Sequence, residues 1–312
     1  MNVPMDFSPS LLDGLRACLR TSIARNPADV LLFSGGLDTS ILAVLSPTIP
    51  AVHVCLGETG RDLPYAETVA RALGLELILR RVTVEEALAA IPDVIRIRRS
   101  FDPALPNDLA ISFALDEARK RGYRSVMTGD GADELFAGYS YMFHLDLERY
   151  IPWLVGRMHF SANELGAGLG LRVSQPYLDL EVVTLALTVP PALKVRYEDG
   201  RQYGKWVLRK AFEGALPTEV CWQDKRPIEV GSGFTALRET IAGLVTESDQ
   251  RAPVRFLCPD HPYYYRIYRE VVGRIPRPGP GEKSCPGCGA GMLAAAHHCR
   301  VCGWVEPWES PS

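Results

Sequence analysis

The segment Ser34-Gly35-Gly36-Leu37-Asp38-Thr39-Ser40 combines residue types that can hold a phosphate group. Two adjacent glycines let the backbone come close to an anion and turn its amides inward. The hydroxyls of Ser34, Thr39 and Ser40 add donors, and a helix that starts here would present its positive N-terminus. Asp38 is acidic in a site otherwise suited to anions, which is consistent with a bound divalent cation. The segment therefore predicts a site for a phosphate ligand and its metal.

Two other interpretations of this segment are less favoured. A P-loop requires a Gly-Lys-Ser/Thr ending, which is absent here. A turn between a strand and a helix, with glycines used only for geometry, stays open as an alternative. The anion site is preferred because the hydroxyls and Asp38 directly follow a short apolar run.

Four of the eight cysteines lie close together at the C-terminal end. They form two Cys-x2-Cys pairs that are separated by ten residues, and each pair is followed by glycine. This spacing is typical of a closed zinc ribbon with four thiolate ligands, with iron as the less favoured metal. His297 and His298 are expected to flank the metal rather than to bind it. The predicted zinc ligands are Cys285, Cys288, Cys299 and Cys302.

The role of this cysteine-rich tail follows less directly from its sequence. A closed thiolate site does no chemistry, so we expect a docking or lid module that needs its metal to fold. Arg300 beside Trp304 and Trp308 is compatible with nucleic-acid binding, but Glu306 and Glu309 argue against it. A protein partner or a dimer contact is therefore favoured over nucleic acid.

The elements that must position these residues alternate between strands and helices. Short apolar runs predict strands, and the 3.6-residue spacing of apolar side chains predicts helices. Strands are predicted over 29–33, 51–56, 75–82 and 125–128, and helices over 38–45, 64–73 and 109–121. This order predicts an α/β fold with a parallel, twisted sheet of about five strands and helices on both faces. Further helices over 181–187, 205–212, 234–245 and 263–272 predict a helical extension.

The domain organisation follows from one break in composition. The run Pro276-Arg277-Pro278-Gly279-Pro280-Gly281 can neither extend a helix nor pair in a sheet, so it predicts a stiff linker. We expect a main domain over 1–275, a linker over 276–283 and a zinc ribbon over 284–312.

Length and composition exclude several classes of protein. The 312 residues carry 34 basic and 37 acidic side chains, which argues against a chain that coats nucleic acid. No run supplies the roughly 18 apolar residues of a membrane helix, and the N-terminus lacks the pattern of a secretory signal. We therefore expect a cytoplasmic protein, with the four scattered cysteines as buried apolar residues rather than disulfides.

Four ordered motifs resemble a known family. The segment 34–40 resembles the pyrophosphatase loop of the N-type ATP pyrophosphatases (the PP-loop superfamily). Segments 128–139, 175–179 and 205–212 resemble motifs in the synthetase domain of asparagine synthetase B. The resemblance covers about residues 10 to 245 and implies an adenine nucleotide alpha-hydrolase-like fold. It also implies an AMP- and pyrophosphate-forming ligase that adenylates a small carboxylate, aspartate or a related acid, and transfers ammonia or an amine to it.

The resemblance assigns roles to residues around ATP and Mg²⁺. Lys205 matches a catalytic lysine near the α-phosphate, Lys225 is a second contact to the leaving group, and both have surface lysines as the alternative. Asp38, also counted as catalytic, and Asp133 would lie near magnesium, with Asp133 close to the substrate as well. The resemblance places ATP or its pyrophosphate on Ser34, Gly35, Gly36, Asp38, Thr39, Ser40, Gly129 and Lys225.

Three positions concern the second substrate. Asp130 stands where aspartate-using relatives carry a glutamate thought to help deprotonate the attacking nitrogen, and it is one methylene shorter. Asp179 matches an acidic residue that contacts the substrate's amino group, with helix capping as the alternative. Arg99 replaces an acidic residue, so the acceptor either carries extra negative charge or is not aspartate, unless Arg96, Arg98 and Arg99 form only a solvated helix face.

The nitrogen donor and the reaction type keep alternatives. Glutamine-using relatives begin with a glutaminase domain, whereas this sequence begins Met1-Asn2-Val3 and enters the synthetase region directly. We therefore expect free ammonia, another amine, or nitrogen from a separate glutaminase subunit. A tRNA-modifying enzyme that adenylates a base is one alternative, although a Cys-x2-Cys pair inside the nucleotide domain is missing. A non-catalytic nucleotide-binding scaffold is the other.

Overall fold

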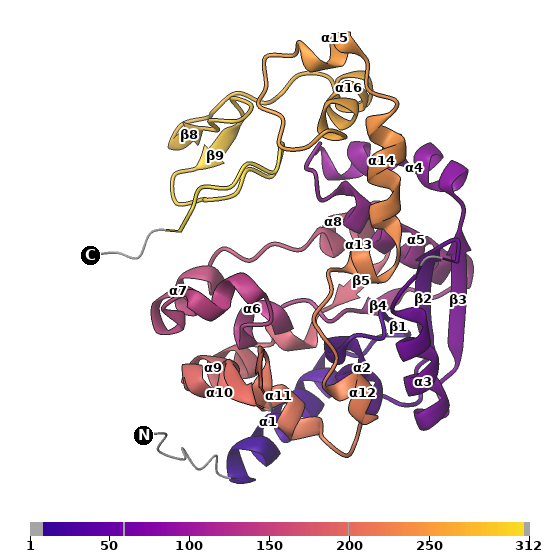
Figure 1. The fold of residues 1–312 in the computed structure, drawn as a ribbon, viewed down its shortest axis with the longest axis vertical. Helices are drawn as coiled ribbons and strands as arrows, with labels where there is room; N and C mark the ends of the chain where they lie inside the picture. The colour runs from indigo at the N-terminus through magenta and orange to yellow at the C-terminus, as the bar shows by residue number, and fades with distance from the viewer. Residues whose placement is uncertain (1–8, 59, 199, 309–312) are drawn as a thin grey trace.

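The computed structural model describes residues 9–58, 60–198 and 200–308 (Figure 1). Its main sheet has five parallel strands in the order β3-β2-β1-β4-β5, and two small antiparallel hairpins, β6-β7 and β8-β9, lie outside it. This confirms the predicted α/β class and parallel sheet. The strands are β1 (Val30–Leu32), β2 (Ala51–Leu56), β3 (Leu77–Val82), β4 (Ser125–Met127), β5 (Arg172–Ser174), β6 (Arg196–Glu198), β7 (Arg201–Tyr203), β8 (Glu282–Ser284) and β9 (Gly291–Leu293).

Helices surround this sheet and form the predicted extension after β4. Those of the first half are α1 (Pro9–Arg25), α2 (Leu37–Leu45), α3 (Leu63–Leu73), α4 (Val84–Arg98), α5 (Leu105–Lys120), α6 (Ala132–Phe136), α7 (Leu147–Val155) and α8 (Ser161–Gly168). Those of the second half are α9 (Leu180–Thr188), α10 (Pro191–Lys194), α11 (Trp206–Phe212), α12 (Thr218–Cys221), α13 (Ile228–Gly231), α14 (Leu237–Ala242), α15 (Glu247–Gln250) and α16 (His261–Val271). Short 3-10 helices are η1 (Ser140–His144), η2 (Pro176–Leu178) and η3 (Phe234–Ala236).

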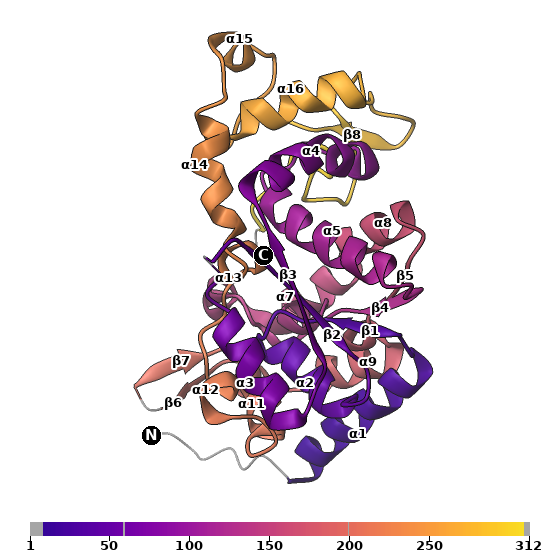
Figure 2. The same cartoon turned by 90° about the vertical axis from the view of Figure 1, so that its right-hand side faces the viewer.

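The two faces of the sheet bury separate hydrophobic clusters. Val52 and Val54 of β2 face a cluster that includes residues of α4, α5 and α16. Leu31 and Ala51 face the other cluster, which includes residues of α1, α2 and α11. Figure 2 shows α2 and α3 on one side of the sheet and α5 with α8 on the other. Burial on both faces explains why β1, β2 and β4 are almost entirely apolar.

The strand order reverses direction between β1 and β4. β1 pairs with β2 on one side and with β4 on the other, so the loops that follow β1 and β4 leave the sheet next to each other. A Cβ atom placed on Gly129, after β4, would lie 3.1 Å from the Cβ of Asp38, after β1. Such a switch point at the carboxyl ends of parallel strands is where ligands bind in open α/β sheets.

The C-terminal tail packs against the main body. The backbone N–H of Phe101 donates to Val301 O at 2.7 Å, and that of Arg255 donates to Gly287 O at 2.7 Å. Cys285 and Met292 belong to the same buried cluster as Phe101. In Figures 1 and 2 the hairpin lies beside α16. The boundaries expected at 276 and 283 stay a prediction, and β8 begins inside the expected linker.

A bilayer-spanning helix would need both length and a sustained apolar composition. Within the described ranges, no helix has both.

Candidate active site

Hydroxyl groups gather where β1 turns into α2. The N–H of Gly36 donates to the Ser34 Oγ at 3.1 Å, and that oxygen lies 3.1 Å from Thr39 Oγ1. Gly36 is the residue that caps the N-terminus of α2, and Asp38 lies in the first turn. The loop therefore presents hydroxyl and backbone donors at a helix N-terminus, an arrangement that suits an anion.

Gly35 is the residue in this loop that only glycine can fill. Its φ is +79°, and a Cβ atom there would lie 2.7 Å from Ala66 N and 2.9 Å from Asp62 O, both backbone atoms of the α3 region. We expect Gly35→Ala to lower the free energy of unfolding by about 1–3 kcal/mol and to weaken the ATP binding that the resemblance predicts, because the loop must move. Urea denaturation and equilibrium ATP binding measure the two effects.

Gly14→Ala provides a matched control for Gly35→Ala. Gly14 lies inside α1, and a Cβ atom placed there meets nothing within 4 Å. This change should stabilise the helix by about 0.5–1 kcal/mol and leave ATP affinity unchanged. Equal stability of the Gly35→Ala variant and the parent would contradict the role given to Gly35.

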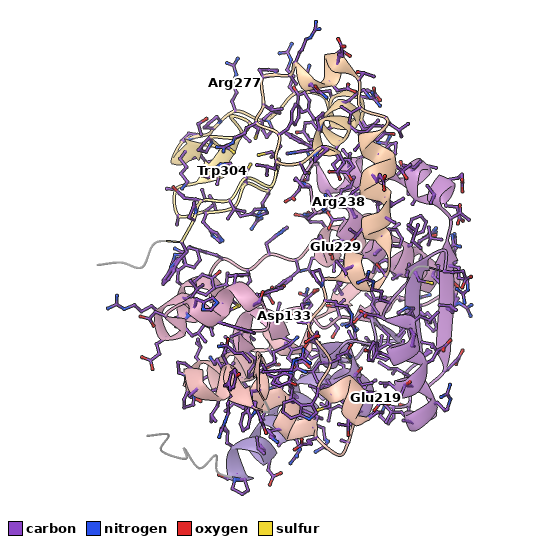
Figure 3. All side chains as sticks on the ribbon, viewed as in Figure 1. Asp133, Glu219, Glu229, Arg238, Arg277 and Trp304 are labelled. Carbon is purple, nitrogen blue, oxygen red and sulfur yellow. The ribbon has the colours of Figure 1, made fainter. Side chains whose placement is uncertain are left out.

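A buried network of charges lies beside the loop. Lys205 is 1% exposed, and its Nζ is 2.8 Å from both carboxylate oxygens of Asp38 and 2.7 Å from Asp133 Oδ1. Lys225 Nζ is 2.8 Å from the other oxygen of Asp133. Two lysines and two aspartates from four separate segments thus meet at the switch point. Figure 3 labels Asp133 near the middle of the molecule.

Backbone geometry places both Asp133 and Lys205. A Cβ atom on Gly138 would lie 1.8 Å from Asp133 Oδ1, so glycine leaves the space that this carboxylate occupies. Lys205 has a left-handed φ of 53°, unusual outside glycine, and its N–H donates to Phe136 O at 3.0 Å. Burial opposes ionisation of Asp133, but the Lys205 and Lys225 ammonium groups lower its pKa to about 2. Asp133 is therefore a carboxylate at neutral pH.

Asp130 lies in the turn between β4 and α6, three residues before Asp133. Its Oδ2 accepts hydrogen bonds from Thr128 Oγ1 at 2.7 Å and from Gln175 Nε2 at 2.8 Å. Burial raises the pKa of Asp130, and the two hydrogen bonds partly offset this effect because they lower the pKa. Both donors bind Oδ2, so neither of them occupies Oδ1. A carboxylate that accepts a proton needs such an oxygen.

Glu134 is a functional candidate that the sequence analysis did not single out. It lines the same cavity, and its Oε1 accepts a hydrogen bond from the Tyr139 hydroxyl at 3.0 Å. Burial, with the negative charge of Asp133 beside it, raises the pKa of Glu134 to about 7. Its place in the segment 128–139 was the only available signal, because a carboxylate next to Asp133 in sequence has no pattern of its own.

These residues share one cavity with a volume of about 450 Å³. Of the residues predicted to bind ATP or its pyrophosphate, Gly35 and Ser40 do not line this cavity. Its wall includes the predicted residues Ser34, Gly36, Asp38, Thr39, Gly129, Asp130, Asp133, Lys205 and Lys225.

Two predicted substrate-binding residues do not reach the cavity. Asp179 caps α9, accepting a hydrogen bond from the Glu181 N–H at 3.0 Å, and it pairs with Arg25 at 3.1 Å. Arg99 is exposed, because its left-handed backbone (φ 50°) ends α4 and turns the chain there. The structure thus favours the capping alternative for Asp179 and removes Arg99 from the wall.

Arg98, the neighbour of Arg99, lines the cavity instead. Its guanidinium Nε is 3.0 Å from Asp108 Oδ2, and its Nη1 contacts the Glu164 carboxylate. The side chains of Arg98 and Asp108 are 9% and 5% exposed. The positive charge of Arg98 is therefore matched by two carboxylates and is not free for a substrate.

The four tail cysteines come together as predicted from their spacing. Their sulfur atoms all lie within 4.8 Å of one another, with Cys285 and Cys302 3.6 Å apart and Cys288 and Cys299 3.8 Å apart. A tetrahedral site with metal–sulfur bonds of about 2.3 Å has sulfur atoms about 3.8 Å apart. The donor set and its spacing therefore fit a four-thiolate metal site.

The sequence of this chain is similar to that of one known protein family. The family model for asparagine synthase matches residues 14–165 and 142–265. The chain is 30% identical to the asparagine synthetase [glutamine-hydrolyzing] of Triphysaria versicolor, over 85% of this chain and 51% of that protein. It is 28% identical to the probable asparagine synthetase [glutamine-hydrolyzing] of Dictyostelium discoideum, over 80% of this chain and 53% of that protein. The chain spans about half the length of these curated relatives.

The family match covers the pyrophosphatase-like loop, both lysines and the two aspartates of the charge network. It ends before the four-cysteine tail, which lies outside the matched residues. Because the match extends over most of the chain and includes the residues that meet in the cavity, this chain belongs to the asparagine synthase family.

Proposed function

We propose that this protein is an ATP-dependent amide synthetase that forms AMP and pyrophosphate. The observation that carries the proposal is the network of Lys205, Lys225, Asp38 and Asp133 beside the 34–40 loop, in one cavity at the switch point of the sheet. Positive groups next to an anion-binding loop match the needs of a departing pyrophosphate.

The cavity offers distinct surroundings for the two ends of ATP. Apolar side chains from β1, β2 and α5 line one part of it, which suits an adenine ring. The hydroxyl-rich loop and the lysines line the adjoining part, which suits the phosphates. The apolar wall includes Leu32, Val52, Val54, Ala110, Ile111 and Ala114.

Asp38 and Asp133 would hold the Mg²⁺ that accompanies ATP. Both carboxylates lie within 2.8 Å of the same ammonium nitrogen, that of Lys205, so they converge on one point. Carboxylate oxygens are the protein ligands that Mg²⁺ prefers, and the ion would neutralise charge on the phosphates when bound. The residues present therefore fit the ion, and Lys205 would then turn to a phosphate oxygen.

The proposed reaction begins when a substrate carboxylate oxygen attacks the α-phosphorus of ATP. The bond from the α-phosphorus to the bridging oxygen breaks, which yields an acyl-adenylate and pyrophosphate. Lys205 and Lys225 stabilise the negative charge that develops on the leaving group. The nitrogen of ammonia or an amine then attacks the acyl carbon, loses a proton, and expels AMP.

Asp130 is the proposed acceptor of that proton. We expect Asp130→Asn to reduce amide formation about 100-fold, because the side chain keeps its shape but loses its basicity. Adenylation should survive, since Asp130 is hydrogen-bonded to Thr128 and Gln175 and forms no ion pair with Lys205 or Lys225 among the described residues. Parallel assays of ATP–pyrophosphate exchange and of amide product measure the two steps.

Asp130→Glu is the matched comparison for Asp130→Asn. It keeps the carboxylate and should retain most of the amide-forming activity. An equal loss of exchange and amide formation in Asp130→Asn would contradict a role confined to the second step.

The acceptor is proposed to be aspartate or a related small acid. The relatives are called glutamine-hydrolyzing asparagine synthetases, which supports an acidic amino acid as the first candidate. The neutralised Arg98 argues against a substrate with more negative charge than aspartate. Ammonia and simple amines are the nitrogen donors to test first.

ATP–pyrophosphate exchange over a panel of amino acids and other carboxylates tests this proposal. We expect exchange to require one carboxylate, and that carboxylate with ammonium or an amine to give amide and AMP. Exchange that depends on RNA would support the tRNA-modifying alternative. No exchange with any carboxylate or RNA would overturn the proposed synthetase and support a nucleotide-binding scaffold.

Zinc is the metal proposed for the cysteine site. Four thiolates with closed geometry favour Zn²⁺ over metals that prefer oxygen ligands. Metal analysis of the purified full chain should find one zinc per chain. A protein partner or a separate glutaminase at this tail stays a prediction.

A further inference from the structure

The loop between the last two cysteine ligands packs closely against the corner that joins α4 to α5. Phe101 N–H donates to Val301 O at 2.7 Å across this contact. Gly303 has a φ of +74°, and a Cβ atom there would lie 2.6 Å from Asp102 Oδ1. The tail therefore approaches Asp102 as closely as a glycine permits.

His298, next to a cysteine ligand, extends this contact into the cavity. Its Nε2 is 3.0 Å from Asp102 Oδ2. Both residues line the same cavity as Lys205 and Asp38. The tail thus contributes a side chain to the wall of the candidate active site, beside Asp102 at the corner between α4 and α5.

The tail also contacts α7 and Arg157, two residues after the end of that helix. Arg157 Nε donates to Ala295 O at 3.1 Å. The rings of Trp153 and His297 have centroids 4.5 Å apart, and Tyr150 meets Trp308 edge to face with centroids 5.2 Å apart. Attachment to α7 and to the α4–α5 corner fixes the segment that carries His298. In Figure 3, Trp304 marks the tail beside this segment.

The remaining side chains at this end of the cavity carry more negative than positive charge. Arg98 pairs with Asp108 and Glu164, and Asp102 adds a third carboxylate. His159 Nε2 lies 2.8 Å from Glu164 Oε1, but burial and the nearby positive charges lower the pKa of His159 to about 4, so it is neutral at pH 7. Arg98, the guanidinium that lines this end among the described residues, is therefore already matched by two carboxylates, and Arg300 near His159 lies outside the cavity wall.

We propose that the metal-bound tail forms the outer wall of the acceptor compartment, and that His298 contacts the acceptor. The group it contacts is uncharged or cationic, an amide, hydroxyl or amine, because a carboxylate there would face the carboxylates of Asp102 and Asp108 and one guanidinium that is already paired. The contact to the acceptor rests on the proposed synthetase function, whereas the wall itself does not.

Hydrogen exchange on the full chain, with and without its metal, tests the wall without any enzymatic assay. Chelation should speed exchange of the Phe101 amide, bonded to Val301 O, by at least about tenfold, and added Zn²⁺ should reverse this. The Arg124 amide, bonded to Asp29 Oδ2 at the amino ends of β1 and β4, is the internal control. An unchanged rate of hydrogen exchange at the Phe101 amide after complete metal removal would contradict the proposal that the metal-bound tail forms this wall.

Kinetics of His298→Ala test the contact to the acceptor. The substrate is the carboxylate that gives the fastest ATP–pyrophosphate exchange, and zinc must still be bound to the variant. The KM for this carboxylate should rise about tenfold, which corresponds to a lost hydrogen bond of about 1.4 kcal/mol. The KM for ATP should stay within about twofold. His297→Ala is the matched control, because His297 packs against Trp153 and does not line the cavity. An unchanged acceptor KM in a zinc-bound His298→Ala protein would overturn the contact.

The same panel tests the charge assignment. Acids whose second polar group is an amine, amide or hydroxyl should exceed dicarboxylic acids without such a group by about tenfold in kcat/KM. The reverse order would overturn the assignment. If no carboxylate supports ATP–pyrophosphate exchange, the synthetase function and the acceptor contact both fail. Hydrogen exchange at the Phe101 amide still decides whether the metal-bound tail forms the outer wall of the cavity.

Discussion

Lys205→Met is expected to reduce ATP–pyrophosphate exchange by at least about 100-fold, the scale of losing one charged stabiliser in a closed site. The ammonium group of Lys205 is buried and contacts both Asp38 and Asp133, so no water can replace it easily. Its removal leaves two adjacent carboxylates without their shared cation. Exchange measured at saturating ATP and carboxylate separates this loss from weaker binding.

Folding must be checked in the same variant, because an unpaired buried carboxylate costs about 3–5 kcal/mol. Circular dichroism shows whether the variant is folded. Thermal unfolding at roughly 1 mM and at roughly 10 mM Mg²⁺ shows whether the ion compensates for the missing charge of the Lys205 ammonium group. Lys120→Met is the matched control, since Lys120 is half exposed and pairs only with Asp116 on its own helix among the ion pairs of the described structure. A folded Lys205→Met protein with normal exchange would contradict the proposed site.

Removal of the tail metal is expected to lower the melting temperature of the whole chain by about 5–10 °C. Cys285, Cys299 and Cys302 belong to the buried cluster that also contains Phe101 and Tyr264 of the main body. Loss of the thiolate site therefore exposes part of the main core and not only the tail. Scanning calorimetry with and without a chelator measures the change.

Cys288→Ser should reproduce this loss and should carry no zinc. Cys18→Ser is the matched control, because Cys18 is a half-buried cysteine in α1 that lies outside the thiolate cluster. ATP affinity should fall much less than stability, since the 34–40 loop packs in the other buried cluster. Identical melting curves for the zinc-bound and zinc-free chain would contradict the structural role of the metal.

Local patterns were sufficient to predict the sheet and the phosphate end of the site. β1 and β2 are apolar runs, and the glycines after β1 mark the turn, so the order of elements was readable. β5 was missed because only Val173 of its three residues is apolar. It becomes a strand by pairing with β4, a partner far away in sequence. Helix α4 was missed, although a capping box at Thr83 and Glu86 begins it.

The acceptor end of the cavity could not be predicted in the same way. Arg98, Asp108, His159 and His298 come from four separate parts of the chain, and only the packing of the tail against α4 and α5 brings them together. Whether Arg98 or its neighbour Arg99 lines the cavity depends on one left-handed residue, Arg99, at the end of α4. Such a backbone conformation at arginine has no signature in the sequence.

The central claim is that a substrate carboxylate attacks the α-phosphorus of ATP. Supplying the panel's best carboxylate with ¹⁸O in its carboxyl group, together with ATP and the amine, tests this directly. If an acyl-adenylate forms, one carboxylate oxygen leaves with the nucleotide, so mass spectrometry should find a single ¹⁸O atom in the AMP. AMP without ¹⁸O, formed alongside labelled product, would contradict the claim.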